Sequence, residues 1–469
     1  MERTLWLDGL RGLASACVAL CHAVVFDSPS TFGFLYRSYW AEAPESRHLI
    51  QLPPFRIIFA GSSMVSLFMV ISGFAISIPL LKARENAGFF RRLSSTATRR
   101  GFRLYLPALL SAALSHFLYF CNLFQLSSWD DPWVGLPKPL TAPWSHMKYL
   151  LWSVIYLLDI SNHHQMNLRH GRLDPNPITV NLWTMPVEVR GSLTVYLLLL
   201  VLAFWNPQAR YLALAGVAMY WFYMGQWDLF SFVSGLFLAE GYVASYYYTE
   251  ADGELLLPGS SCQQHSSTVT NFCRKLSKSA PFSCLREAII STMAVFLLCM
   301  CEGETLPPEY QFLHVFAPFF PPTQTTWGGR DQAEIARRCW ASVGAVLAIY
   351  VVRDTSSSPT VALHLQRLLT SRPAQYLGRI SFPLYLLHNP VYFIFKERVR
   401  VLLWRLLTWT SYPGTEEASR DAGLPFGVAC AGAVLVCGVI MVFASDLWER
   451  TIDRRCLEIA RRFEKRVMS

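Results

Sequence analysis

Residues 5–26 read LWLDGLRGLASACVALCHAVVF, and this stretch decides what kind of fold the chain can adopt. About 20 consecutive, mainly apolar residues are enough for a helix to cross the hydrocarbon core of a bilayer. The stretch has this length and composition, yet it contains Asp8, Arg11 and His22. Ionisable side chains are costly inside a membrane and usually face the interior of a helix bundle, where they have a function. The stretch therefore predicts a membrane span with a functional polar side.

The composition of the whole chain is that of a membrane protein. Of its 469 residues, 53% are hydrophobic and only 16% are charged, whereas soluble domains average about 25% charged residues. The mean hydropathy is +0.29. The net charge of +9 is typical of basic cytoplasmic loops, and no basic run is interleaved with the aromatic residues that a nucleic-acid groove needs. We therefore expect an all-α polytopic membrane protein that contacts the lipid bilayer and binds no nucleic acid.

Apolar segments of span length recur along the chain. We expect ten transmembrane helices, at residues 5–26, 57–81, 102–124, 184–205, 209–226, 229–248, 287–303, 338–353, 380–396 and 425–448. One further apolar segment, residues 147–160, has only 14 residues. It is either an eleventh span or an interfacial or re-entrant segment.

Basic residues decide between ten and eleven spans. The loop 82–103 carries seven lysines and arginines, and so does the tail after residue 449. Both segments should be cytoplasmic, because Lys and Arg concentrate on that side of a membrane protein. Both termini then lie inside, the number of spans is even, and we expect a bundle of about ten transmembrane helices. The polar loop 249–286 falls on the cytoplasmic side, and the loops 27–56 and 125–183 fall outside.

The chain has neither an internal repeat nor a separable soluble domain. We therefore expect residues 1–448 to form one transmembrane domain, followed by a basic cytoplasmic tail at 449–469. Three cysteines in the polar loop, Cys262, Cys273 and Cys284, lack the CxxC spacing of zinc sites. We expect no metal site.

The charged residues of the first span share one side of the helix. At 100° per residue, Arg11 and His22 differ by about 20° and Asp8 and His22 by about 40°. The axial distance from Arg11 to His22 is about 16 Å. Asp8 and Arg11 can form an ion pair that fixes helix packing. His22 is either a core histidine satisfied by a neighbouring helix or a neutral imidazole that can act as a general base.

The sequence TRRGFRLYLPALL joins the second and third expected spans. Arg100 and Arg103 are three residues apart, so they share a side of a helix that enters the membrane. Clustered guanidinium groups can hold phosphates through paired hydrogen bonds. The alternative is that the arginines anchor the helix at lipid headgroups, and spacing alone favours this alternative.

Three further polar residues stand inside expected spans. Glu188, in LWTMPVEVRG, needs a partner because a buried carboxylate is costly. Arg190 does not face it, since residues two apart lie on different sides of a helix, so we expect the partner on another helix. His388 precedes Asn389-Pro390, where the proline frees a backbone carbonyl and the helix can bend around a cavity. Ser72 stands beside Gly73, where small residues usually allow close helix packing.

Taken together, these segments resemble the membrane acyltransferase 3 family, which includes bacterial O-antigen O-acetylases and many fungal members. Five blocks carry the resemblance in the family's order: DGLRGLA at 8–14 followed by His22, FMVISGF at 68–74, RGFRLYLPA at 100–108, WTMPVE at 183–188 and ISFPLYLLHNP at 380–390. The family's core of ten spans with both termini inside agrees with the count from charge. The chain departs from the pattern at Leu106, which is inserted before the proline, and at Arg190-Gly191-Ser192, where an aromatic residue and a tyrosine are usual.

The resemblance implies the transfer of an acyl group, often acetyl, from an acyl-CoA co-substrate to a hydroxylated acceptor such as a sugar, a lipid or a small metabolite. It implies that His22 is the general base, a role typically worth 10²–10⁴ in rate. Arg100 and Arg103 would hold the CoA phosphates, and Arg11 would line the donor path or pair with Asp8.

In the same resemblance, Glu188 and His388 would each either orient His22 or bind the acceptor. An acyl-enzyme route through Ser72 needs more assumptions, because nothing in the sequence pairs this serine with a base. A transporter that uses the intramembrane charges as a substrate or proton path is the alternative from another class, but such proteins show two similar halves. The sequence of the tryptophan- and cysteine-rich segments looks more like that of fungal members, whose acceptors are often secondary metabolites or surface glycans.

Overall fold

The computed structural model describes residues 4–25, 32, 35, 37–125, 136–160, 177–254, 280–300, 306–316, 332–353 and 361–468. Within these residues the chain is helical and has no strand. The helices are α1 (Leu5–Val25), α3 (Gly61–Leu81), α4 (Phe89–Phe120), α5 (Pro143–Leu158), α6 (Thr184–Val201), α7 (Pro207–Tyr223), α8 (Trp227–Glu254), α10 (Ala280–Leu298), α11 (Gln332–Arg353), α12 (Val361–Leu369), α13 (Arg372–Val391), α14 (Glu397–Thr408), α15 (Thr415–Asp421), α16 (Gly423–Trp448) and α17 (Arg454–Met468).

Short irregular helices complete these elements. The 3₁₀-helices are η2 (Pro44–Ser46), η3 (Leu49–Gln51), η4 (Phe55–Phe59), η5 (Pro177–Trp183) and η6 (Pro308–Phe316), and the π-helical turns are η8 (Tyr392–Lys396) and η9 (Glu449–Asp453). The π-helical turn η8 joins α13 to α14 without a break, and η9 does the same between α16 and α17. The polar loop expected at 249–286 lies largely outside the described residues, together with Cys262 and Cys273 and the side chain of Cys284.

Each expected span overlaps a helix of the described chain. Five stretches of the described chain are long and apolar enough to cross a membrane: Leu5–Val24, Gly61–Leu81, Ile178–Val201, Glu334–Arg353 and Gly423–Val467. The full count of ten stays a prediction. The segment expected at 147–160 lies in α5, whose 16 residues extend over about 24 Å. This length is less than the roughly 30 Å of a bilayer core.

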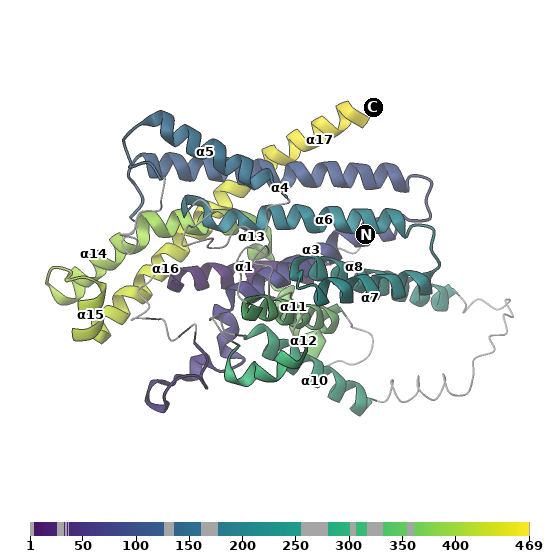
Figure 1. Cartoon of the computed structure of the whole chain (residues 1–469), viewed down its shortest axis with the longest axis horizontal. Coiled ribbons are helices and arrows are strands. Elements are labelled where there is room, and N and C mark those ends of the chain that lie inside the picture. The colour runs from purple at the N-terminus through teal and green to yellow at the C-terminus, as the bar shows by residue number, and fades with distance from the viewer. Residues whose placement is uncertain are drawn as a thin grey trace.

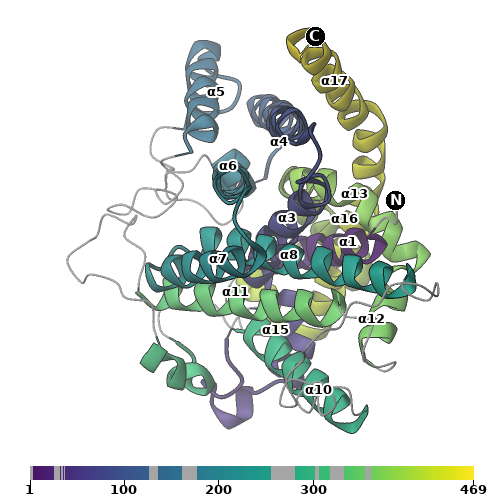
Figure 2. The same cartoon turned by 90° about the vertical axis from the view of Figure 1, so that its right-hand side faces the viewer.

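The helices form one bundle in which α4 and α6 run next to each other (Figure 1) and are seen end-on after a quarter turn (Figure 2). Around them, α3 packs against α8 and α1 packs against α13. Both chain ends lie in the right-hand half of Figure 1. There α17 packs against the first half of α4, and its free end projects from the bundle. The two arginine-rich segments of the chain are therefore close together.

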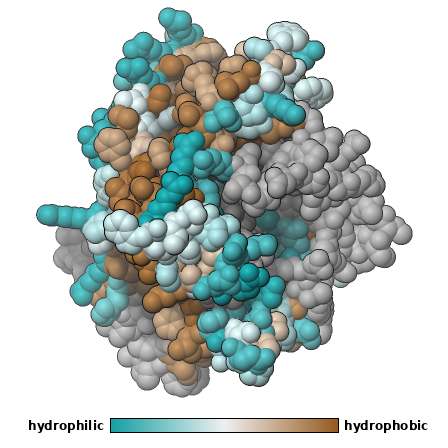
Figure 3. Space-filling view, turned by 90° about the vertical axis from the view of Figure 1, so that its left-hand side faces the viewer, coloured by the Kyte–Doolittle hydropathy of each residue, from teal (hydrophilic) through white to brown (hydrophobic). Residues whose placement is uncertain are grey.

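Apolar side chains cover much of the outer surface. On α16, Leu435, Val439 and Phe443 are exposed at intervals of four residues and form a stripe that faces away from the bundle. In the end view of Figure 3, brown hydrophobic side chains form a band from top to bottom beside teal hydrophilic ones. Large exposed apolar patches on a protein mark a surface that meets a membrane or a partner.

Small residues bring the central helices into close contact. A Cβ atom on Gly12 of α1 would lie 2.4 Å from the backbone nitrogen of Gly378 on α13. A Cβ atom on Gly73 of α3 would lie 2.3 Å from the carbonyl oxygen of Phe232 on α8. Both positions therefore require glycine, as expected for Gly73 from its sequence context. The first contact places the polar side of α1 directly against α13.

Candidate active site

Two histidines from opposite ends of the chain meet inside the bundle. His22 lies in the last turn of α1, and His388 lies near the end of α13. Their ring centroids are 4.8 Å apart and their planes are nearly perpendicular, at 83°. His388 is completely buried, whereas His22 is half-buried. Of the two imidazoles, His22 is therefore the more accessible.

The backbone fixes the protonation pattern of His388. Its Nδ1 lies 2.7 Å from the carbonyl oxygen of Tyr385, and because a carbonyl only accepts, Nδ1 carries the proton. The Nε2 atom of the neutral ring is then an acceptor. Among the residues that the structure describes, Nε2 has no hydrogen-bond partner. His388 thus keeps one defined orientation next to His22.

Pro390 frees backbone carbonyls one turn earlier in α13, as the sequence predicts. Proline has no N–H group, so Leu386 four residues before it has lost its helical donor. Ser111 Oγ of α4 and Asn181 Nδ2 each donate to the oxygen of Leu386, both at 3.3 Å. Asn181 Nδ2 also donates to the oxygen of Tyr385 at 2.7 Å. Two separate parts of the chain, α4 and η5, thereby hold the turn that carries His388.

Tyr385 joins this turn to the start of α6. Its hydroxyl donates to the carbonyl oxygen of Asn181 and lies 2.7 Å from the hydroxyl of Thr184. Asn181 was not expected from the sequence as a site residue. The only signal for it was a polar amide within an apolar stretch, two residues before the tryptophan of the WTMPVE block.

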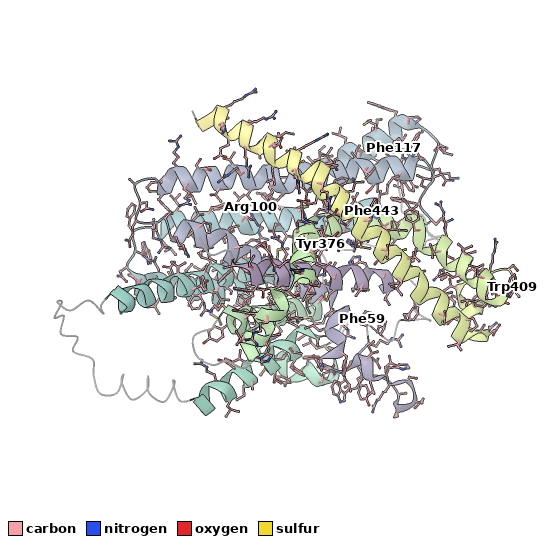
Figure 4. The ribbon with its side chains drawn as sticks, turned by 180° about the vertical axis from the view of Figure 1, so that it is seen from behind. Phe59, Arg100, Phe117, Tyr376, Trp409 and Phe443 are labelled. Atoms are coloured by element: carbon pink, nitrogen blue, oxygen red, sulfur yellow. The ribbon has the colours of Figure 1, made fainter. Side chains whose placement is uncertain are left out.

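Glu188 is held by two other helices. This buried carboxylate of α6 accepts a hydrogen bond from Ser72 Oγ of α3 at 2.6 Å and forms an ion pair with Arg100 of α4. Arg100 Nε also donates to Ser192 Oγ at 2.6 Å, and its side chain lies between α4 and α6 (Figure 4). The expectation that the partner of Glu188 comes from another helix is confirmed. The groups that hold Glu188 are thus Ser72 and Arg100 rather than His22.

The three residues that depart from the family pattern each have a structural role. Arg190 pairs with Asp228 of α8 at 3.3 Å and donates to Gln226 at 3.0 Å. A Cβ atom on Gly191 would lie 2.0 Å from the ring of Phe232, so a larger residue does not fit there. Ser192 holds Arg100, as described above. All three residues therefore take part in the packing of α6 against α4 and α8.

Asp8 and Arg11 form the ion pair that was one of the two expectations for them. Arg11 Nη2 lies 3.3 Å from Asp8 Oδ1. The same guanidinium donates to Ser381 Oγ at 2.9 Å and to the carbonyl oxygen of Gly378 at 3.2 Å. The side chain of Arg11 is 34% exposed. Arg11 thus ties α1 to α13.

Arg103 lies one turn after Arg100 on α4. It is exposed, and the charges that act on it are those of Arg11, Arg100, Asp8 and Asp453. Within the described chain, Arg103 has no carboxylate at ion-pair distance, whereas Arg11 and Arg100 each have one. Three arginines from two helices therefore converge, and Arg103 is the one best placed to receive an added anion.

The π-helical turn η8 holds the end of α1 that carries His22. Tyr392 donates its hydroxyl to the carbonyl oxygen of Ala19 at 2.9 Å, and the buried Lys396 donates to that of Ala23 at 2.6 Å. Ala19 and Ala23 flank His22 on α1. Sequence reasoning did not single out either η8 residue, because both look like ordinary members of an amphipathic span end. π-helical turns occur frequently at functional sites.

Comparisons with known proteins show what this chain is similar to. A family model described as an acyltransferase domain matches residues 4–445. An O-acetyltransferase, PaAT-1 of Phomopsis amygdali, is 26% identical over 83% of this chain and 72% of its own length. Acyltransferase R4 of a Phoma species is 22% identical over 97% and 95%, and acyltransferase clz18 of Cochliobolus lunatus is 21% identical over 96% and 95%. No solved structure matches the chain significantly.

Proposed function

The chain belongs to the acyltransferase 3 family, and we propose that it is an integral membrane O-acyltransferase that moves an acyl group from acyl-CoA to a hydroxyl group. The contact between His22 and His388 carries this proposal, because it presents one accessible imidazole supported by a second, fully buried one. Five apolar stretches of span length support the membrane location.

His22 acts as the general base in this proposal. It takes the proton from the acceptor hydroxyl as the oxygen attacks the carbonyl carbon of the thioester. The new C–O bond forms, the C–S bond breaks, and the imidazolium returns its proton to the departing CoA thiolate. The products are an ester and free CoA. His388 acts through His22 as a positioning residue, since its own ring is completely buried.

The donor enters from the end of the bundle where the arginines converge. Arg103 binds a CoA phosphate, with Arg11 beside it. Arg100 is neutralised by Glu188, so its contribution is to hold α4 in place against α6. From Arg11 to His22 the pantetheine arm covers about 16 Å along α1. Because acyl-CoA is cytoplasmic, both chain ends and the arginine-rich half of α4 lie on the cytoplasmic side.

Acetyl is the acyl group that we propose, and a hydroxylated small metabolite, lipid or glycan is the acceptor. The support is the name of one relative, an O-acetyltransferase of a fungus. The direct transfer does not use Ser72, because its hydroxyl donates to the Glu188 carboxylate. A carboxylate that is already paired with Arg100 is a poor base for activating that hydroxyl.

The first experiment measures radiolabelled acetyl transfer and CoA release by the full-length protein in lipid nanodiscs. We expect the wild type to use acetyl-CoA with a panel of hydroxylated acceptors, or to hydrolyse it slowly. His22→Ala should lose at least 10²-fold in rate, with unchanged thermal unfolding. His146→Ala is the matched control, because this imidazole of α5 packs on Phe120 instead. Full activity of His22→Ala would overturn the assignment of the base.

A further inference from the structure

The last helix, α17, has an apolar side that the bundle covers only in part. Cys456 and Ala460 are buried, and the ring of Phe463 packs on that of Phe102 of α4 with centroids 4.7 Å apart. Glu464 accepts a hydrogen bond from Ser95 and forms an ion pair with Arg99, both on α4, the latter at 3.4 Å. These contacts fix which side of α17 faces α4.

Next to this docked side runs an apolar stripe that the bundle leaves partly exposed. Ile459, Phe463 and Val467 are 50%, 43% and 64% exposed. They are four residues apart, so each is displaced by only about 40° from the one before and all three form one stripe. An exposed stripe of Ile, Phe and Val on a helix end that projects from the bundle (Figure 2) needs a second surface to cover it.

The remaining sides of α17 are strongly basic. Between residues 454 and 468 the helix contains six basic and only two acidic residues, and the basic ones are Arg454, Arg455, Arg461, Arg462, Lys465 and Arg466. All six are exposed. Arg462 lies 3.8 Å from Glu458 and Arg454 lies 3.4 Å from Glu449, but exposed pairs of this kind contribute little and leave the charge available.

We propose that α17 is an interfacial helix that binds anionic lipid headgroups of the membrane in which the bundle sits. A membrane surface is the occupant that satisfies both observations. Acyl chains near the headgroups cover the stripe of Ile459, Phe463 and Val467, and anionic headgroups bind the arginines that flank it. A soluble anion would meet only the charge and would leave the stripe in water.

Binding of the full-length protein, in neutral detergent micelles, to fluorescent phosphatidylserine or phosphatidylcholine tests this proposal by anisotropy. We expect saturable binding of phosphatidylserine that is more than tenfold tighter than that of phosphatidylcholine. The triple variant R455Q/R462Q/R466Q, which neutralises one flank of the stripe, should lose at least tenfold in affinity for phosphatidylserine. The triple variant I459S/F463S/V467S should weaken binding by a similar factor.

A matched control removes three exposed arginines at the opposite end of the bundle, in α14 and α15, as R398Q/R405Q/R420Q. It should bind phosphatidylserine as the wild type does. Size-exclusion profiles and melting temperatures of all variants show whether the bundle is intact. Equal loss in the control, unchanged affinity in either α17 variant, or full competition by glycerophosphoserine without acyl chains would each overturn the proposal. None of these outcomes depends on acyl transfer.

Discussion

The ring of His388 meets that of His22 edge to face, with centroids 4.8 Å apart, and it is the buried member of the pair. The hydrogen bond from Nδ1 to the carbonyl oxygen of Tyr385 holds the His388 ring in one orientation. In the proposed mechanism His22 therefore contacts the substrates, and His388 sets the position of His22.

His388→Phe should lower kcat for acetyl transfer by about 10²-fold with little change in the KM for acetyl-CoA. A displaced base loses near-attack geometry, and an error of about 1 Å can cost this factor. Steady-state kinetics in nanodiscs measure both constants. His388→Gln retains a hydrogen-bonding side chain and should recover part of the loss. A change in KM alone would contradict a positioning role.

Arg103→Ala should raise the KM for acetyl-CoA about tenfold and leave kcat nearly unchanged. The guanidinium supplies binding that is equal in the ground state and the transition state, and such binding appears in KM. Arg92→Ala is the control, because Arg92 is an exposed arginine nearer the start of the same helix, α4. Equal effects of the two variants would show that the arginines act only through membrane anchoring.

Replacing only one member of the ion pair between Arg100 and Glu188 should destabilise the protein more than replacing both members. Glu188→Ala leaves the partly buried guanidinium of Arg100 without its carboxylate, and breaking a buried pair in this way costs about 3–5 kcal/mol. The double variant Arg100→Met with Glu188→Met restores apolar packing and should recover most of this loss. Thermal unfolding in detergent compares the three proteins. A double variant as unstable as Glu188→Ala would contradict this explanation.

Gly73→Ala should lower the melting temperature and impair assembly of α3 with α8. The new Cβ atom would lie 2.3 Å from the carbonyl oxygen of Phe232, and a backbone atom cannot turn aside as a flexible side chain can. Gly101→Ala on α4 is the control, since a Cβ atom there meets no other atom within 4 Å. It should be neutral or stabilising by up to about 1 kcal/mol. Size-exclusion chromatography and thermal unfolding report both effects.

The sequence could indicate only by elimination which side chains of different helices contact each other. The spacing of Arg190 and Glu188 correctly indicated that the two side chains do not face each other. It could not indicate that Arg100 takes the place of Arg190, because that depends on how α4 lies against α6. Likewise, Tyr392 and Lys396 gained their contacts to α1 from the π-helical turn, and no sequence pattern indicated that turn.

What the sequence by itself determined follows from local rules. Hydropathy and length placed the helices, the 100° rotation per residue put Asp8, Arg11 and His22 on one side, and the missing N–H of Pro390 freed a carbonyl. The tertiary structure alone decided which distant groups meet. It set His22 against His388, Arg100 against Glu188, and α17 against α4 with half of its apolar side uncovered. These contacts join residues far apart in the chain, and they exist only because close packing at glycines such as Gly12 and Gly73 fixes how the helices pack.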